Sequence, residues 1–161
     1  MNLNNTPHSP PAVRIVTLPP GRVAYYQASG EHPELAAWKV LLEWADKNGL
    51  LASRSSFGLF GFDNPPPSPG KPVYGYEVWI TVGPKTEEEG PVKIKDFPGG
   101  TYAVTHTELN AIGETWKQLV RWVKAGPYDE GAGQCLEEHL STPGKAADPQ
   151  LLSLYLPISE T

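Results

Sequence analysis

The chain has 161 residues and a mass of 17.5 kDa, which fits one domain, or two small repeats that share a core, and argues against a multidomain enzyme. Hydrophobic residues make up 39% of the chain and aromatic residues 10%, so wholesale disorder is excluded. The net charge is −5 and basic residues form no cluster, which disfavours direct binding to DNA or RNA.

The first part of the chain predicts a polar lead-in, two strands and a helix. Residues 1–11 are polar and proline-rich, and we expect them to be disordered. The β-branched and aromatic runs at 13–16 and 22–26 are separated by Leu-Pro-Pro-Gly, which indicates a strand, a turn and a second strand. Apolar residues between positions 33 and 48 follow the spacing of an amphipathic helix, and Gly49 is well placed to end it.

Two further strands follow, separated by a loop. Residues 57–62 form a short apolar run, whereas residues 63–70 contain four prolines, which cannot donate backbone hydrogen bonds, and predict a loop. Residues 73–82 alternate clearly: Tyr76, Val78, Ile80 and Val82 share one face, and Glu77, Trp79 and Thr81 share the other. The acidic run at 85–90 predicts a solvated connection at the midpoint of the chain.

The same pattern then starts again. Strands are predicted at 92–95 and 101–106, a helix from Ile112 to Val123, and closing strands at 134–140 and 151–157. Five apolar residues of the first helix have a partner 78 positions later in the second: Trp38, Leu41, Leu42, Trp44 and Ala45 match Trp116, Leu119, Val120, Trp122 and Val123. The chain therefore looks like an internal duplication.

These elements predict an α+β fold in a single domain at residues 12–161. We expect two pseudo-symmetric units of strand, helix, strand and strand, at about 12–84 and 91–158. Because one unit could not bury its own sheet and helix faces, the two should pack side by side into an antiparallel-rich sheet with both helices on one face. The other face would then be free, and a ligand cleft would form where the halves meet.

Several kinds of chemistry find no support in the sequence. There is no Walker loop, no nucleophile elbow and no complete dinucleotide fingerprint, and the four histidines lack metal-ligand spacing, so we expect neither a cofactor nor a metal. No apolar run is long enough to span a membrane, and the N-terminus lacks the features of an export signal. The single cysteine, Cys135, fits a reducing compartment. We expect a cytoplasmic protein.

The strand at 134–140 is the most informative for function. If Leu136 faces the helices, Glu137 and His139 lie on the free face. Glu77 and Trp79 also lie opposite the apolar stripe of their own strand, so two carboxylates and several aromatic rings could converge there.

Each of these residues also has a structural interpretation. Glu77 could be an ordinary exposed strand residue, and the helical tryptophans fit the core better than a binding site. Trp79 and Tyr102 lie on strands and are better candidates for a pocket, whereas the ring of Tyr76 shares the face of Val78 and fits the core.

The order of motifs resembles the GyrI-like small-molecule-binding domains over roughly residues 13–158. The motifs are Leu-Pro-Pro-Gly-Arg-Val-Ala at 18–24, Asp-Asn-Pro at 63–65, Tyr-Glu-Val at 76–78, Phe-Pro-Gly-Gly-Thr-Tyr-Ala at 97–103 and Cys-Leu-Glu at 135–137, together with the two tryptophan-bearing helices. The resemblance implies a tandem duplication whose pocket, at the pseudo-two-fold axis, receives flat and often cationic molecules against aromatic rings and one glutamate.

The resemblance places polar and aromatic groups near Tyr76, so Tyr76 joins Glu137, Glu77, Trp79, Tyr102 and His139 as a ligand-binding candidate. It also implies which residue is the pocket glutamate. Glu137 matches its position, whereas Glu138 stands where the family usually has an aliphatic residue and His139 where it has an aromatic one. A slip of one residue along this strand would present Glu138 to the pocket instead.

Three functions remain open at this stage. The first is a binding protein that captures planar, hydrophobic, often cationic compounds. The second, implied by the family, is a hydrolase of strained cyclopropane-bearing compounds that uses Glu137 as general acid or base. The third, also implied by the resemblance, is a protein that inhibits DNA gyrase, with an acidic surface including Glu87 to Glu89 that would mimic the charge of DNA. The sequence contains no basic helix-turn-helix segment.

Overall fold

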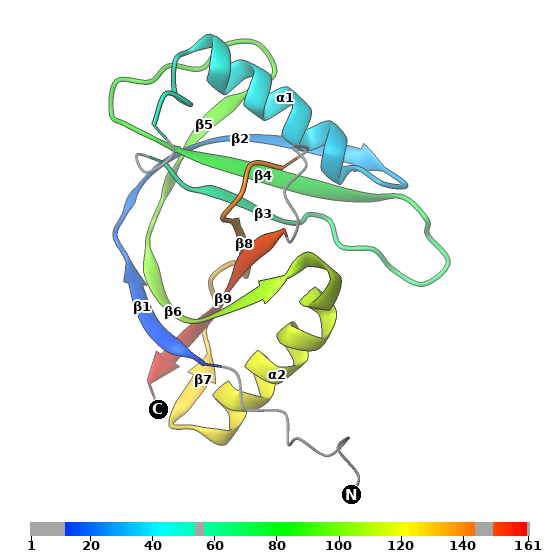
Figure 1. Cartoon of the computed structure of the whole chain (residues 1–161), viewed down its shortest axis with the longest axis vertical. Helices are drawn as coiled ribbons and strands as arrows, with labels where there is room; N and C mark the ends of the chain where they lie inside the picture. Colours follow the sequence, from blue (N-terminus) through cyan, green and yellow to red (C-terminus); the bar gives the residue numbers. More distant parts are fainter. Residues whose placement is uncertain (1–11, 54–56, 144–149, 161) are drawn as a thin grey trace, which may run out of the picture.

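The computed structural model describes residues 12–53, 57–143 and 150–160, so the predicted disorder of residues 1–11 falls outside the described residues. Two helices and nine strands make up these ranges (Figure 1). In chain order they are β1 (Arg14–Leu18), β2 (Gly21–Gly30), α1 (Glu34–Lys47), β3 (Leu59–Asp63), β4 (Tyr74–Val82), β5 (Lys93–Phe97), β6 (Gly100–Glu108), the 3-10 turn η2 (Leu109–Ala111), α2 (Ile112–Ala125), β7 (Tyr128–Glu130), β8 (Leu136–His139) and β9 (Leu151–Glu160).

The strands form one antiparallel sheet whose order reflects the internal duplication. Eight strands run β1-β6-β9-β8-β3-β4-β2-β5, and β7 pairs with β9. Reading inward from either end gives equivalent strands of the two halves, and β8 and β3 meet at the centre. The predicted α+β arrangement of pseudo-symmetric repeats is therefore confirmed.

The two halves exchange their outermost strands. β1 precedes β2 but pairs with β6, and β5 precedes β6 but pairs with β2. The two tight turns that make these crossings touch each other. Gly99 has φ +74°, and a Cβ built on it would lie 2.5 Å from the carbonyl oxygen of Leu18. Glycine satisfies both demands at this crossing, the left-handed backbone and the close approach.

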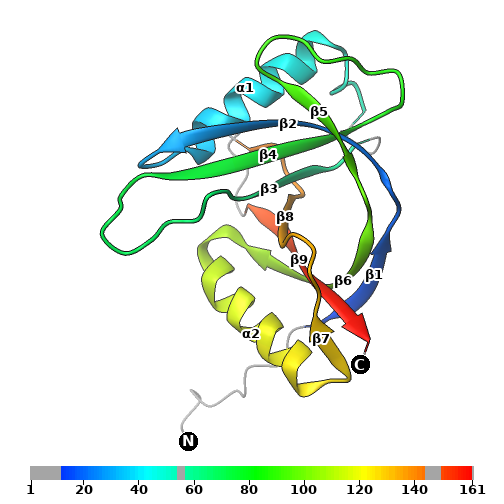
Figure 2. The same cartoon turned by 180° about the vertical axis from the view of Figure 1, so that it is seen from behind.

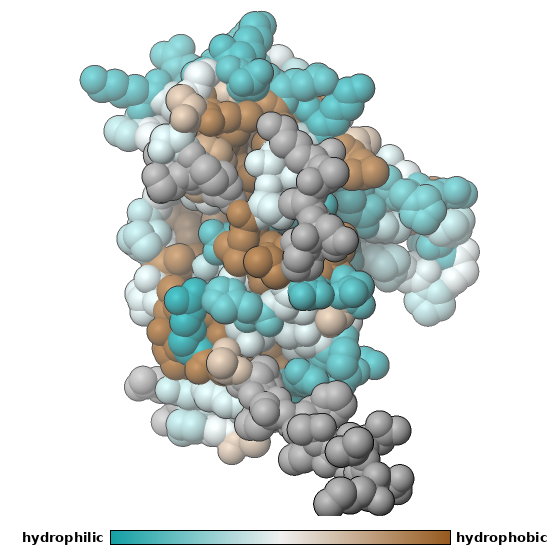
Figure 3. Space-filling view, in the orientation of Figure 1, coloured by the Kyte–Doolittle hydropathy of each residue, from teal (hydrophilic) through white to brown (hydrophobic). Residues whose placement is uncertain are grey.

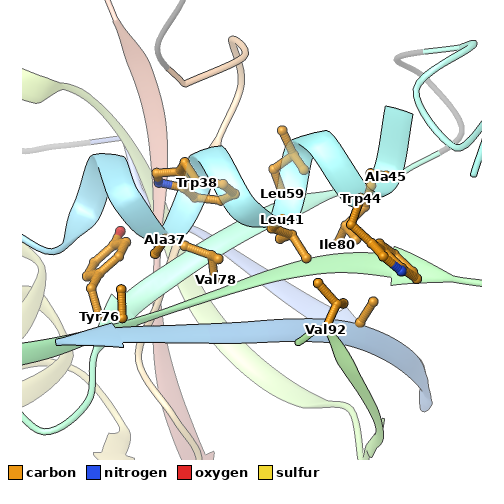
Figure 4. Close-up of a cluster of buried hydrophobic side chains, with 12 residues drawn as sticks. Ala37, Trp38, Leu41, Trp44, Ala45, Leu59, Tyr76, Val78, Ile80 and Val92 are labelled. Atoms are coloured by element: carbon orange, nitrogen blue, oxygen red, sulfur yellow. The ribbon is translucent and has the colours of Figure 1, made fainter. Parts of the chain in front are cut away.

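Both helices cover the same face of the sheet, as predicted. α1 packs on a core that includes Ala24, Val78 and Ile80 (Figure 4), and α2 packs on the equivalent positions Ala103, Leu154 and Leu156. Because the two helices pack on equivalent positions of equivalent strands, they need similar apolar residues at equivalent helix positions. This makes the 78-residue offset visible in the sequence. Within the described residues, neither helix is long and apolar enough to cross a membrane.

The expectation of a free second face is wrong. The sheet curls, as the two opposite views show (Figures 1 and 2), and its helix-free face closes on a core of its own. That core is built by equivalent strands of both halves: Val23, Phe60, Phe62, Trp79, Tyr102, Val104, Leu136 and Tyr155. Its edge-to-face aromatic pairs include Tyr102 with Tyr155 at 5.7 Å and Phe62 with Trp79 at 5.2 Å between ring centroids. Apolar residues on both faces of a strand make curling favourable, because it buries the second face.

Candidate functional site

A cavity of about 740 Å³ opens on the helix-covered face, where the N-termini of α1 and α2 approach the central strands β3 and β8. Figure 3 shows apolar surface near the middle of one side of the molecule, between the levels of the two helices. The residues that line the cavity are Glu34, Leu35, Trp38, Asp63, Tyr76, Leu109, Ile112, Glu137, His139, Pro143, Gln150 and Leu152. The cavity therefore takes residues from both halves.

The cavity lies on the pseudo-two-fold axis of the fold. In the first half Asp63 is paired with Tyr76 across β3 and β4, and in the second half His139 is paired with Leu152 across β8 and β9. All four of these residues line the cavity, so equivalent positions of the two halves face each other across it. The halves differ in chemistry, however, because the first supplies a carboxylate and a phenol where the second supplies an imidazole and an alkyl group.

Glu137 lies near the axis and is largely withdrawn from water. Tyr76 donates a hydrogen bond from its hydroxyl to Glu137 Oε1, at 3.3 Å. Burial, together with the negative charges of Asp63 and Glu34, raises the pKa of the Glu137 carboxyl to about 7, although hydrogen bonds from Trp116 and Tyr76 oppose the shift. Glu137 is therefore poised to gain or lose a proton near neutral pH.

Gly61 makes the contact between Tyr76 and Glu137 possible. Gly61 on β3 pairs directly with Glu137 on β8 and with Val78 on β4. A Cβ built on Gly61 would lie 2.7 Å from Tyr76 Cζ and closer still to the hydroxyl oxygen. The phenol ring thus lies across the bare backbone of β3 and reaches from β4 to β8. Figure 4 shows Tyr76 at the end of the α1 core that is remote from Trp44.

Two more carboxylates belong to the first-half side of the cavity. Asp63 is exposed at the end of β3, and Glu34 begins α1, where it accepts a hydrogen bond from the hydroxyl of Tyr74. Desolvation by the surrounding protein raises the pKa of the Asp63 carboxyl, and the negative charge of Glu34 adds to the shift. Three acids consequently surround one opening, without a lysine or arginine among the described lining residues.

Aromatic and apolar groups form the remaining walls. The rings of Trp38 and His139 meet edge to face, with 4.8 Å between their centroids. Leu35 and Leu109, from the N-terminal ends of the two helical segments, line the cavity while exposing 70% and 48% of their surface. Large apolar side chains left in water at a cavity mouth favour an apolar ligand.

The structure brings together three of the six residues predicted from the sequence: Glu137, Tyr76 and His139 line the same cavity. The predicted orientation of β8 is wrong, because Glu137 and His139 face the helices and Leu136 faces the core inside the curl. The alternation along the strand was correct, but the curl supplies a second apolar core, and Leu136 packs there.

The other three residues, Glu77, Trp79 and Tyr102, lie on the opposite face of the sheet. Tyr102 and Trp79 belong to the core inside the curl. Glu77 is 4% exposed and accepts hydrogen bonds from Trp79 Nε1 at 2.5 Å and Lys95 Nζ at 2.6 Å. The expected convergence of Glu77 with Glu137 is therefore wrong, since the two carboxylates lie on different faces.

Glu138 also faces away from the cavity. It accepts a hydrogen bond from the hydroxyl of Tyr155, at 2.8 Å, and Tyr155 belongs to the core inside the curl. Of the two neighbouring glutamates, Glu137 is the one that lines the cavity.

Sequence reasoning missed the other nine residues that line the cavity, and three of them bear most on its chemistry. Asp63 fell in the predicted loop, Glu34 in the first turn of a helix, and Trp38 among residues assigned to the core. Trp38 is indeed 3% exposed and packs in the α1 core, but it also lines the cavity. The pairing of β3 with β8 brings these residues to Glu137, and no local pattern reveals that pairing.

In the described ranges, no group of three or more potential ligands could hold a metal ion.

Comparison with known proteins places this geometry among related folds. The family model of the GyrI-like small molecule binding domain matches residues 11–159. No curated protein matches the sequence. Among solved structures, EcmrR in a complex with DNA is similar at 13% identity and TM-score 0.69. The similarity covers 92% of this chain but 57% of EcmrR, so the chain spans little more than half of that longer protein.

Two further structures show the same fold. A hydrolase from Listeria innocua is similar at 14% identity and TM-score 0.68, covering 94% of each chain. SAV2435 bound to tetraphenylphosphonium is similar at 11% identity and TM-score 0.52, covering 91% of this chain and 93% of SAV2435.

Proposed function

Because the chain belongs to the GyrI-like family of small-molecule binding domains, we propose that it captures planar, hydrophobic, cationic compounds in the cavity around Glu137. The observation that carries this proposal is a largely buried carboxylate in a cavity lined in part by aromatic rings, with no basic partner among the described residues. Within the described residues, the ion pairs join Lys47 to Glu89 and Lys95 to Glu77, and neither involves the cavity acids.

A bound cation would remove the main cost of this arrangement. A carboxylate withdrawn from water without a cationic partner is destabilised, and this desolvation is the main cause of the raised pKa of Glu137. A cation beside it restores the missing partner, and aromatic faces add about 0.5 to 2 kcal/mol each toward a cation. Burial of a flat ring contributes about 25 cal/mol per Å² of apolar surface. Selectivity would rest on charge and flatness, so a broad set of ligands would bind.

The proposed function is tested with two flat probes that share a ring system. Ethidium carries one fixed positive charge, and phenanthridine is neutral at pH 8. We expect ethidium to bind more tightly than phenanthridine, and Glu137→Gln to weaken ethidium binding at least tenfold while leaving phenanthridine unchanged. Glu138→Gln is the matched control, because it neutralises the neighbouring carboxylate on the opposite face. Equal losses for both probes, or no loss, would reject the charge-pairing role.

The hydrolase interpretation has one specific observation in its favour. Glu137, with a pKa of about 7, accepts a hydrogen bond from the Tyr76 hydroxyl, and a carboxyl group with such a pKa can exchange protons with a substrate at neutral pH. The structurally similar hydrolase from Listeria innocua points the same way at the level of the fold. Turnover of a cyclopropane-bearing compound that is lost in Glu137→Gln would favour this alternative. Recovery of the compound unchanged would leave capture as the function.

Two further expectations stay predictions from the sequence and the family resemblance. A cytoplasmic location is one, and binding to DNA gyrase is the other. Supercoiling by purified gyrase, with and without the protein, tests the second, and we expect no effect.

A further inference from the structure

The cavity is polarised between its two halves. On the first-half side stand Asp63 and Glu34, with Glu137 near the axis, and on the second-half side stand Leu109, Ile112 and Leu152. Equivalent positions sharpen the contrast, because Glu34 and Ile112 each begin the helix of their half. The first-half wall thus carries two carboxylates, whereas the second-half wall combines these aliphatic side chains with His139 and Gln150.

The acidic wall carries more negative charge than a single bound cation can neutralise. Glu34 accepts a hydrogen bond from Tyr74, but a neutral donor leaves its charge in place. Asp63 takes part in neither of the ion pairs formed by the described residues. If one cation pairs with Glu137, the charges of Asp63 and Glu34 are left at the mouth, on the same side of the cavity. The aliphatic wall faces them and gives a flat ring apolar surface to cover.

We propose that the cavity is selective for flat amphiphilic dications, with the ring on the wall of Leu109, Ile112 and Leu152, one cationic centre at Glu137 and the second at Asp63 and Glu34. This inference rests on the proposed function and adds a ligand class to it. The cavity volume of about 740 Å³ leaves room for a three-ring system with a short charged side arm. A ligand with a single cationic centre would leave the acids at the mouth unneutralised.

The two cationic centres would contribute differently. The inner centre meets a desolvated carboxylate, so its contribution resists salt, whereas the outer centre meets exposed carboxylates whose attraction is screened. Exposed ion pairs contribute modestly, which limits the advantage of a dication over a matched monocation to about threefold to tenfold at low ionic strength. The same advantage should shrink toward onefold in 0.5 M salt.

Propidium and ethidium provide the test, because they share the phenanthridinium ring and differ in a side arm that gives propidium its second positive charge. We expect propidium to bind the wild-type protein about fivefold more tightly than ethidium at 20 mM salt. Asp63→Asn should remove most of this advantage, because it weakens propidium binding more than ethidium binding. Asp129→Asn, an exposed substitution on β7 that does not line the cavity, is the matched control and should keep the advantage.

The outcomes separate this inference from the proposed function. Equal binding of the two dyes to wild type, or an advantage that survives both Asp63→Asn and Glu34→Gln, overturns the preference for dications and leaves cation capture intact. Failure of both dyes to bind overturns the proposed function and the inference together. Neither variant should unfold more than about 1 °C below wild type, since Asp129 is exposed and Asp63→Asn removes a carboxylate that desolvation and Glu34 destabilise. This establishes that the comparison is made on folded protein.

Discussion

Glu137 should make the ligand-free protein less stable as the pH rises. Its pKa is about 7 in the folded chain and near 4.5 for an ordinary glutamate, so between these values the unfolded state ionises first. Stability is therefore highest while Glu137 is protonated in both states, declines from about pH 4.5 and levels off above pH 7. The difference in pKa corresponds to about 3 kcal/mol at most.

Glu137→Gln removes this cost, which yields the first prediction. The free energy of unfolding of the variant, measured by urea unfolding without ligand, should rise relative to that of wild type by about 2 to 3 kcal/mol as the pH goes from 4.5 to 8. A variant that gains stability while it loses cation binding is the pattern expected of a strained binding residue. A difference between variant and wild type that does not change with pH would contradict the assigned pKa. Glu138→Gln is again the control on the other face.

The close contact between Gly61 and the Tyr76 ring can be tested by substitution. Gly61→Ala would place a methyl group where the Tyr76 ring now lies, so the ring must move away from Glu137. We expect a loss of about 1 to 3 kcal/mol in stability, and also weaker ethidium binding because Tyr76 is part of the cavity wall.

Gly113→Ala is the matched control for that experiment. A Cβ at Gly113 meets nothing within 4 Å, and the position lies within α2, where alanine is favoured over glycine by up to about 1 kcal/mol. The control should therefore be neutral or stabilising. If Gly61→Ala behaves in the same way, Tyr76 does not depend on the bare backbone at this position.

Strand β5 is fastened to β2 and β4 by an ion pair that is buried on the Glu77 side and partly exposed on the Lys95 side. Lys95 lies 2.6 Å from Glu77 on β4, and its ammonium group also lies 4.2 Å from the ring centroid of Tyr25 on β2. Trp79 and Asn64 donate further hydrogen bonds to Glu77. Glu77 therefore serves the edge of the sheet, where sequence reasoning had assigned it to the ligand site.

Lys95→Met tests this role. The change leaves the buried Glu77 carboxylate without its cation, and removing one partner of a buried pair is destabilising by several kcal/mol. Because Lys95 is itself 37% exposed at its side chain, we expect a smaller loss of about 1 to 3 kcal/mol. Lys47→Met is the control, since its pair with Glu89 is exposed on both sides, and it should cost less than about 0.5 kcal/mol. Similar losses for both variants in urea unfolding would reject a special role for Lys95.

At the level of elements, hydrophobic periodicity predicted where helices and strands lie, but it did not predict which face of β8 meets the helices. The helix expected at 33–48 is found at Glu34–Lys47, and the strand expected at 73–82 is found at Tyr74–Val82. Alternation along β8 was also correct, but Leu136 and Glu138 on one face and Glu137 and His139 on the other do not reveal which face meets the helices. The short strand β7 has a polar sequence, Tyr-Asp-Glu, and left no signal of its own.

The whole molecule is held together by the exchange of β1 and β5 between the halves. The sequence indicated the duplication, because equivalent helices need the same apolar stripe. It could not indicate the exchange, since a strand, a proline-glycine turn and a strand also describe an ordinary hairpin. The choice between the two is made by long-range pairing of β1 with β6 and of β5 with β2. A different long-range pairing, of β3 with β8, brings Asp63 and Glu34 to the cavity.

Gly99 lies where the β1–β2 and β5–β6 turns touch, so its substitution tests how tightly the exchange of strands is packed. Gly99→Ala combines an unfavourable left-handed backbone with a clash against Leu18, Pro19 and Pro20. Gly49→Ala has nearly the same φ, +71° against +74°, but open space around its Cβ, and should cost about 1 kcal/mol. We expect Gly99→Ala to cost about 1 to 3 kcal/mol more than this control. Equal costs would mean that the crossing tolerates a side chain.

Proton release on binding tests most directly whether a cation pairs with the Glu137 carboxylate. With a pKa of about 7, Glu137 is half protonated in the free protein at pH 7, and a cation that binds its ionised form must expel that fraction. Calorimetric titration of ethidium at pH 7 in two buffers of different ionisation enthalpy should show release of about half a proton per ethidium bound, and close to none for Glu137→Gln. Proton uptake, or the same release from the variant, would contradict the account.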